Sequence, residues 1–233
     1  PYRACAARCN FLGLDRPDVQ YAAKEVSRAM SNPHQSKVVS LKRLGRYLHK
    51  HPRAVFMFKF QAPQDHIRIY SDTNWAGCIK TRKSTQGGVV LLGGCCIKSW
   101  SSTQSLIALS SGEAELMALI KATSEALGLA QLAQCWQMKL IISVFVDSSA
   151  ALAVTARMGN GKLRHVRIGH LWVQQLSDSE EVAFRKVRGT ANPADLMTKF
   201  LAASKLRPLV ESLSQRYSAG HAQCRLALDR GVQ

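Results

Sequence analysis

The sequence predicts an α/β fold, in which a mixed β-sheet is flanked by helices and preceded by a helical appendage. Up to about residue 63, apolar residues recur at helical spacing. From His66 onward, short strands appear, and helical stretches then alternate with further strands. The resulting order, β-β-β-α-β-α-α-β-α, is typical of helices packed on a mixed sheet.

The first segment is expected to be mainly helical. Pro17 stands where a first helical residue is tolerated, and Tyr21, Val26 and Met30 follow at spacings close to one helical face. A second helix is expected over Ser36–Lys50. Its basic residues alternate with apolar ones, and no acidic residue occurs between Glu25 and Asp65. Two interpretations stay open, a solvated helix face or a binding surface for a nucleic-acid backbone.

Three strands are expected next, at His66–Tyr70, Gly87–Leu92 and Cys95–Trp100. The Gly93-Gly94 pair predicts a tight hairpin between the last two. A long helix over Ser111–Trp136 should then bury Leu116, Leu119, Ile120, Thr123, Leu127 and Leu132.

The short apolar run Leu140–Val146 predicts a buried central strand. The elements expected after it are a helix at Ser149–Ala156, a turn at Asn160-Gly161, a helix near Val166–Leu176, a strand at Glu181–Val187 and a helix opening at Pro193. We divide the chain into residues 1–64 (helical), 65–201 (the α/β domain) and 202–233 (a C-terminal helix and, after about Tyr217, a flexible polar tail).

The charge balance predicts a polyanionic partner. The 233 residues include 32 Lys and Arg against 15 Asp and Glu, a net charge of +17. Nucleic acid is the partner that this excess favours, with an anionic membrane or general basicity as alternatives. Seven cysteines without zinc-site spacing are expected to be reduced, mostly buried thiols in an intracellular protein. No signal peptide or membrane-spanning run is expected, and the opening Pro1 suggests a fragment of a longer protein.

Four acidic residues stand at ends of the predicted elements. Asp72 follows the first strand, Glu115 lies early in the long helix, Asp147 ends the central strand and Asp195 opens the last helix. Each alone has a structural explanation, because Asp often caps helices. Together they predict a metal site, since carboxylates held close repel one another unless divalent cations neutralise them. Two Mg²⁺ or Mn²⁺ ions there would support phosphodiester hydrolysis.

Several motifs resemble those of one family. They are YSDTNWAG (70–77), RKSTQG (82–87), SWSS (99–102), ALSSGEAE (108–115), VDSSA (146–150) and ADLMTK (194–199). In this order they resemble the ribonuclease H domain of copia-class retrotransposon polyproteins. Upstream, SRAMSNP (27–33) and LKR (41–43) resemble the end of the preceding reverse transcriptase, its thumb or connection region. The resemblance covers about residues 2–215.

This resemblance implies a ribonuclease H-like fold with a five-stranded mixed sheet, and a metal-dependent endonuclease that hydrolyses RNA in RNA/DNA hybrids. Asp72, Glu115, Asp147 and Asp195 match the family's metal-binding acids. Glu115 is preferred to Glu113, because Ser110 and Glu113 form a capping box. Further implied are a partner in the remaining reverse transcriptase polyprotein, a cytoplasmic or nuclear location, and a virus-like particle if the element is active. No paired-aspartate polymerase motif occurs upstream.

The chain also departs from the family's pattern. Asn74 replaces a second Asp, which is not one of the four acids. The loop before Asp195 lacks the histidine of cellular ribonucleases H; His165 and His170 are the nearest substitutes, although such histidines are more often structural. Trp75 and Trp100 are interpreted as sheet-packing aromatics. The residues predicted to contact nucleic acid are Lys37, Lys42, Arg43, Arg46, Arg82, Lys83, Lys162, Arg164 and Arg167.

Two other functions stay open. The first is a catalytically inactive remnant or domesticated module that binds nucleic acid without turnover. The second is another enzyme of the same fold, such as an integrase or resolvase, because one fold supports several phosphotransfer reactions. Bound metal would favour either enzyme over the binding module, and substrate choice would separate the enzymes.

Overall fold

The computed structural model describes residues 1–159, 161 and 170–220. Its centre is a five-stranded sheet of β2 (His66–Asn74), β3 (Thr85–Leu92), β4 (Cys95–Thr103), β5 (Ile141–Val146) and β6 (Val182–Lys186), in the order β4-β3-β2-β5-β6. Strands β2, β3 and β4 are antiparallel neighbours, whereas β5 runs parallel to β2 and β6 parallel to β5. The predicted mixed five-stranded sheet is therefore confirmed.

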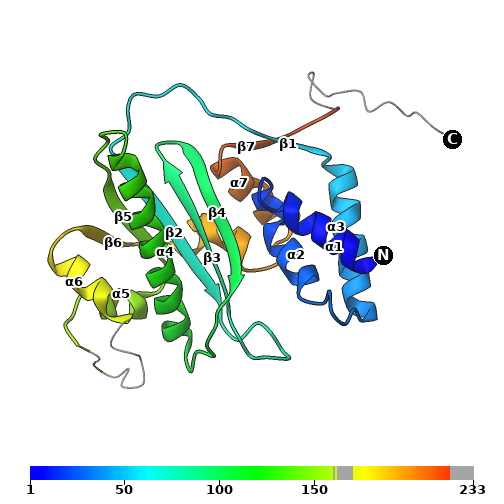
Figure 1. Ribbon diagram of the computed structural model, residues 1–233, viewed down its shortest axis with the longest axis horizontal. Helices are drawn as coiled ribbons and strands as arrows, with labels where there is room; N and C mark the ends of the chain where they lie inside the picture. Colours follow the sequence, from blue (N-terminus) through cyan, green and yellow to red (C-terminus); the bar gives the residue numbers. More distant parts are fainter. Residues whose placement is uncertain (160, 162–169, 221–233) are drawn as a thin grey trace.

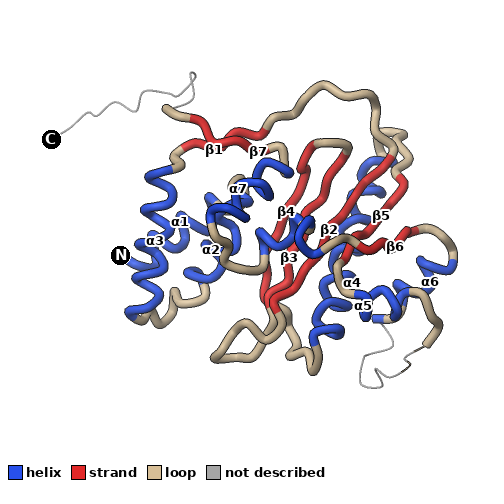
Figure 2. The backbone as a smooth tube through the Cα atoms, turned by 180° about the vertical axis from the view of Figure 1, so that it is seen from behind, coloured by secondary structure: helices blue, strands red, loops and turns tan. Residues whose placement is uncertain are grey.

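Helices cover both faces of this sheet (Figures 1 and 2). One face carries α4 (Ser111–Gln134), with α5 (Ser149–Thr155) and α6 (Trp172–Asp178) toward β6. Their shared core is fully buried at Ile69, Leu116, Leu119 and Val144. The other face carries the 3₁₀ helix η3 (Pro193–Met197) and α7 (Ala203–Ser212), which bury their own apolar cluster against β3.

The N-terminal appendage consists of α1 (Tyr2–Leu12), α2 (Pro17–Ser27) and α3 (Gln35–Lys50). These helices share a small core of Ala6, Val19, Val26 and Leu44. Helix α2 joins this core to the sheet: Lys24 Nζ donates to Thr85 Oγ1 at 2.7 Å, and Gln20 donates to the carbonyl of Ser99. The appendage therefore lies beside the edge strand β4 and next to η3 and α7 (Figure 2).

A second, two-stranded sheet was not predicted. Strand β1 (Arg53–Phe56) pairs antiparallel with β7 (Gln215–Ser218) and links the end of the appendage to the C-terminal segment. Tyr47 of α3 strengthens this link, because its hydroxyl lies 2.6 Å from that of Tyr217. Four-residue strands are too short to show a periodic pattern, so the sequence carries no clear signal for them.

Several smaller expectations need correction. Leu132 is 49% exposed and Trp75 is 48% exposed, so neither is buried as predicted; Trp100 is buried. The helix expected at Pro193 is a short 3₁₀ helix. Among the described cysteines only Cys95 and Cys96 are buried, although all six are free thiols.

The Asn160-Gly161 turn, the start of the helix expected near Val166 and the C-terminal tail beyond residue 220 fall wholly or partly outside the described residues. Within them, the helix of that region begins at Trp172.

Helix α4 is the single described helix whose length and composition would allow it to cross a membrane. No segment of that kind was expected. Buried helices of soluble domains pass the same test, and α4 packs its apolar residues against the central sheet. Length and composition alone therefore give only weak evidence for a membrane span.

Gly88 provides a test of the packing between β3 and β4. A methyl group at Gly88 would lie 2.1 Å from Cζ2 of Trp100, whereas one at Gly94 would meet nothing within 4 Å. Overpacking a buried site costs about 1–3 kcal/mol. We therefore expect Gly88→Ala to lower the free energy of unfolding, measured by urea denaturation, by about 2 kcal/mol or more, and Gly94→Ala to change it little. Equal stability of the two variants would contradict this packing.

Candidate metal centre

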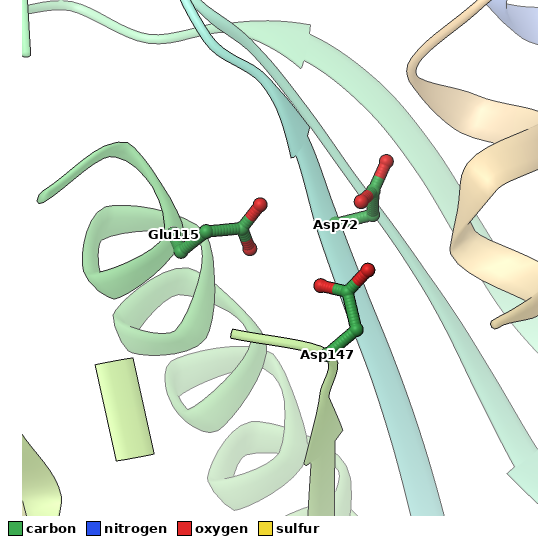
Figure 3. A group of neighbouring side chains, drawn as sticks. All are labelled: Asp72, Glu115 and Asp147. Atoms are coloured by element: carbon green, nitrogen blue, oxygen red, sulfur yellow. The ribbon is translucent and has the colours of Figure 1, made fainter. Parts of the chain in front are cut away.

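Three acidic side chains from three separate elements meet at one end of the central sheet (Figure 3). Asp72 comes from β2, Glu115 from α4, and Asp147 directly follows β5. One carboxylate oxygen of each lies within 4.8 Å of those of the other two. Carboxylate oxygens at such spacing suit a divalent cation such as Mg²⁺ or Mn²⁺.

The local structure explains why these side chains converge. Strands β2 and β5 are parallel neighbours, so Asp72 and Asp147 both lie toward the same edge. Helix α4 begins just before Glu115, because Ser110 accepts a hydrogen bond from the Glu113 amide at 3.2 Å. The Glu113 carboxylate accepts from the amide of Leu109. Glu113 thus acts at the start of α4, and Glu115 points to the two aspartates (Figure 3).

The hydrogen bonds of the group leave room for a cation. Thr73 Oγ1 donates to Glu115 Oε1 at 2.8 Å, and the Thr198 hydroxyl donates to Asp72 Oδ2. The second Glu115 oxygen, Oε2, is buried and has no hydrogen-bond partner. A buried carboxylate oxygen without a partner is costly, and a bound metal ion would satisfy it.

The electrostatics of the group favour the same ligand. Burial, followed by the negative charge of Asp72, raises the pKa of Glu115 to about 8. Burial also raises the pKa of Asp72 to about 6, although Lys199 and Thr198 oppose the shift. Both shifts mean that protons or other cations must compensate these carboxylates. The residues present therefore fit a divalent metal.

Asp195 lies beside this group but outside it. Its carboxylate is not among the three that meet within 4.8 Å. Instead, Lys199 Nζ lies 2.8 Å from Asp195 Oδ1 and 3.5 Å from Asp72 Oδ2. The contact with Asp195 is the shorter of these two ion pairs. The structure thus brings three of the four predicted acids together and connects the fourth through a lysine.

The loop that carries Asp195 is fastened to β2 by Asn192. This residue is fully buried; its Nδ2 donates to the carbonyl of Ser71 at 2.9 Å and its Oδ1 caps the amide of Ala194. Gly189 of the same loop passes so close to Asp147 that a Cβ there would lie 3.1 Å from Oδ2. The loop therefore depends on these two residues for its position over the acids.

The predicted nucleic-acid contacts fall in two places. Arg82 and Lys83 lie in the loop between β2 and β3, which leaves the sheet at the end where Asp72 lies. Lys42, Arg43 and Arg46 are exposed on α3, whereas Lys37 is paired with Glu25 at 3.1 Å. Arg43 and Lys199 line one cavity of about 420 Å³ between α2, α3 and the segment after η3.

Four of the residues named in advance cannot be placed at the site. Lys162, Arg164, His165 and Arg167 lie outside the described residues. His170 is described, but it lines a different cavity, on the α4 side, together with Gln104 and Trp172. No described histidine belongs to the group of acids.

Sequence reasoning assigned no role to Thr73, Asn192, Thr198 and Lys199, which support the acids here. Each stands within three or four residues of an acid, and three of them occur in the quoted motifs. Their proximity in the sequence to Asp72 and Asp195 was therefore the signal that could have identified them. The contacts of Asn192 and Thr198 with β2 join segments more than one hundred residues apart and could not be derived from spacing.

Comparisons with solved structures find ribonucleases H. One is ribonuclease H1 of the archaeon Halobacterium salinarum, at 18% identity with a TM-score of 0.40, covering 57% of this chain and 93% of that one. Another is the N-terminal ribonuclease H domain of Rv2228c from Mycobacterium tuberculosis, at 16% identity with a TM-score of 0.39, covering 63% of this chain and 97% of that one. No protein-family model matches the chain.

Sequence relatives are more informative. The chain is 29% identical over 194 residues to the retrovirus-related Pol polyprotein from transposon TNT 1-94 of Nicotiana tabacum, which is 82% of this chain and 14% of that protein. It is 29% identical over 206 residues to that from transposon RE1 of Arabidopsis thaliana, covering 86% of this chain and 14% of that protein.

A shorter relative is secreted RxLR effector protein 161 of Plasmopara viticola, at 36% identity over 130 residues, 55% of this chain and 91% of that protein. The chain thus spans about one seventh of the length of the Pol polyproteins that it matches. These relatives are retrovirus-related Pol polyproteins of plant transposons, and together with the ordered motifs and the fold they are consistent with a copia-type ribonuclease H region.

Proposed function

We propose that the chain is a metal-dependent endonuclease that hydrolyses the RNA strand of RNA/DNA hybrids. The observation that carries this proposal is the meeting of Asp72, Glu115 and Asp147 within 4.8 Å at one edge of the sheet. A structural explanation for three acids held this close together, two of them buried, is poor, because their mutual repulsion destabilises the fold. The excess of positive charge elsewhere in the chain suits a polyanionic substrate.

The chain's own residues would hold and orient the metal. Asp72, Glu115 and Asp147 would hold it, with Asp195 completing the set of acids. Divalent ions bound there would polarise the scissile phosphodiester and lower the pKa of an attacking water. Thr73 and Thr198 fix two of the carboxylates through hydrogen bonds, so that their oxygens need not rearrange when a cation arrives.

The surrounding protein would be a polyprotein. We assign residues 1–64 to the end of a reverse transcriptase and residues 65–201 to the nuclease, with the reaction taking place in the cytoplasm or nucleus during reverse transcription. Hybrid recognition would rest on 2′-hydroxyls and phosphates, so cleavage should show little base preference. The exposed basic residues of the β2–β3 loop and of α3 are the candidates for phosphate contact.

The acids can be tested by cleavage of a labelled hybrid with Mg²⁺ or Mn²⁺. We expect Asp72→Asn and Glu115→Gln each to lower the cleavage rate at least about 100-fold, because losing even an outer partner of a metal ligand costs about 10–100-fold. Asp178→Asn and Glu211→Gln make the same chemical changes at exposed positions and should leave the rate unchanged. Tight hybrid binding without cleavage under either metal would instead support the inactive binding module.

Metal binding can also be measured through thermal stability. The pKa values of Asp72 and Glu115 are raised, so burial of these groups contributes stability only while they are protonated, and that contribution is lost as the pH rises toward about 8. Added Mn²⁺ should therefore raise the melting temperature more at pH 8.5 than at pH 5.5, since it replaces the protons.

In the same melting experiment, Glu115→Gln should reduce the Mn²⁺ effect at pH 8.5, and Glu211→Gln should not. Glu211 makes a suitable control because it forms only an exposed ion pair with Arg207 on α7. A Glu115→Gln protein that responds to Mn²⁺ like the wild type would place the metal elsewhere.

The basic residues of the loop between β2 and β3 should make a salt-dependent contribution to hybrid binding. We expect Arg82→Gln combined with Lys83→Gln to weaken binding of hybrids of any sequence about tenfold, and to lower the slope of log K against log salt by up to about two. Arg3→Gln with Arg8→Gln, two exposed residues of α1, removes the same charge as a control. Fluorescence anisotropy at several salt concentrations measures both; identical slopes for the two double variants would contradict the assignment.

A further inference from the structure

Lys199 places a positive charge inside the group of acids. Its ammonium lies between Asp195 and Asp72, 2.8 Å and 3.5 Å from their nearest oxygens. Its side chain is 40% exposed, so it reaches the acids from the solvent side of the site. Asp195 and Asp72 therefore already share one cation that belongs to the chain itself.

The fold, rather than a flexible surface side chain, determines this position. Lys199 follows Asp195 by one helical turn, and its amide bonds to the Asp195 carbonyl. The neighbouring Thr198 is fully buried and its hydroxyl donates to Asp72. Met197 packs so closely onto β3 that a Cβ added at Gly87 would lie 2.3 Å from the Cβ of Met197. Lys199 is consequently carried to the acids by a segment that is fixed on both sides.

Asp72 thus has two distinct neighbourhoods. Toward α4 and β5 it faces Glu115 and Asp147, in the group of three with its unpartnered Glu115 oxygen. Toward η3 it faces Asp195, and there Lys199 stands between the two carboxylates. A divalent ion and an ammonium cannot share the second position, because like charges a few ångströms apart repel strongly.

We propose that Lys199 is an internal cation which occupies one of the two cation positions of the site and must leave it before a second divalent ion binds between Asp72 and Asp195. This inference rests on the proposed metal-dependent function. The first ion binds at Asp72, Glu115 and Asp147 without displacing any side chain. A phosphate of the bound substrate offers the released ammonium a new partner, so that the second ion is admitted when substrate is present.

The test is the stoichiometry of Mn²⁺ binding to the whole chain without nucleic acid, measured by electron paramagnetic resonance of the free ion. The wild type should bind one Mn²⁺ tightly and a second at least about tenfold more weakly. Lys199→Gln should tighten the second site at least about tenfold. Lys199→Arg keeps the charge and should behave like the wild type, as should Lys50→Gln, which removes an exposed charge at the end of α3.

Asp195→Asn provides an independent arm, should Lys199→Gln fail to fold in a thermal melt. It should abolish the second site and leave the tight one, and loss of the tight ion would overturn the separation of the two positions. If folded Lys199→Gln binds the second Mn²⁺ with unchanged affinity, the role of Lys199 is overturned, while the proposed metal-dependent function stands. Absence of Mn²⁺ binding in every protein would overturn the proposed metal-dependent function as well.

Discussion

The repulsion between carboxylates crowded at one edge of a sheet is the constraint on which the site depends. Asp72, Glu115 and Asp147 come from elements that the core fixes rigidly, since β2, β5 and α4 share one buried apolar cluster. The acids cannot move apart without disturbing that core. Their charge must therefore be compensated by protons, by the chain's own cations or by bound metal, and the raised pKa values of Asp72 and Glu115 reflect this requirement.

The segment from Asn192 to Lys199 supplies part of that compensation from the opposite face of the sheet. It is anchored by the amide of Asn192 at one end and donates a hydroxyl and an ammonium to the acids at the other. The acids thus join two layers on opposite faces of the sheet, with α4 on one side and η3 on the other (Figures 1 and 2). Any change in the charge of the site therefore alters the electrostatic energy of both layers.

Part of the grouping of the acids could be predicted from the sequence for a physical reason. Asp72 and Asp147 follow apolar runs whose pattern indicates strands, and strands of parallel direction end at the same edge, so the convergence of their side chains could be derived. The offset of Asp195 could not, because it depends on a 3₁₀ turn and on an ion pair with Lys199. The β1–β7 sheet and the exposure of Leu132 likewise depend on tertiary packing that no local pattern records.

The site is acidic, whereas the chain as a whole is strongly basic. The chain carries a net charge of +17, yet its acidic group is concentrated at one sheet edge, next to the basic loop that contains Arg82 and Lys83. A polyanion attracted by the positive surface would be repelled by the bare acids, and cations at the acids remove that repulsion. Substrate and metal should therefore bind cooperatively, because each lowers the electrostatic cost of the other, and Lys199 lies at the point where the two charges meet.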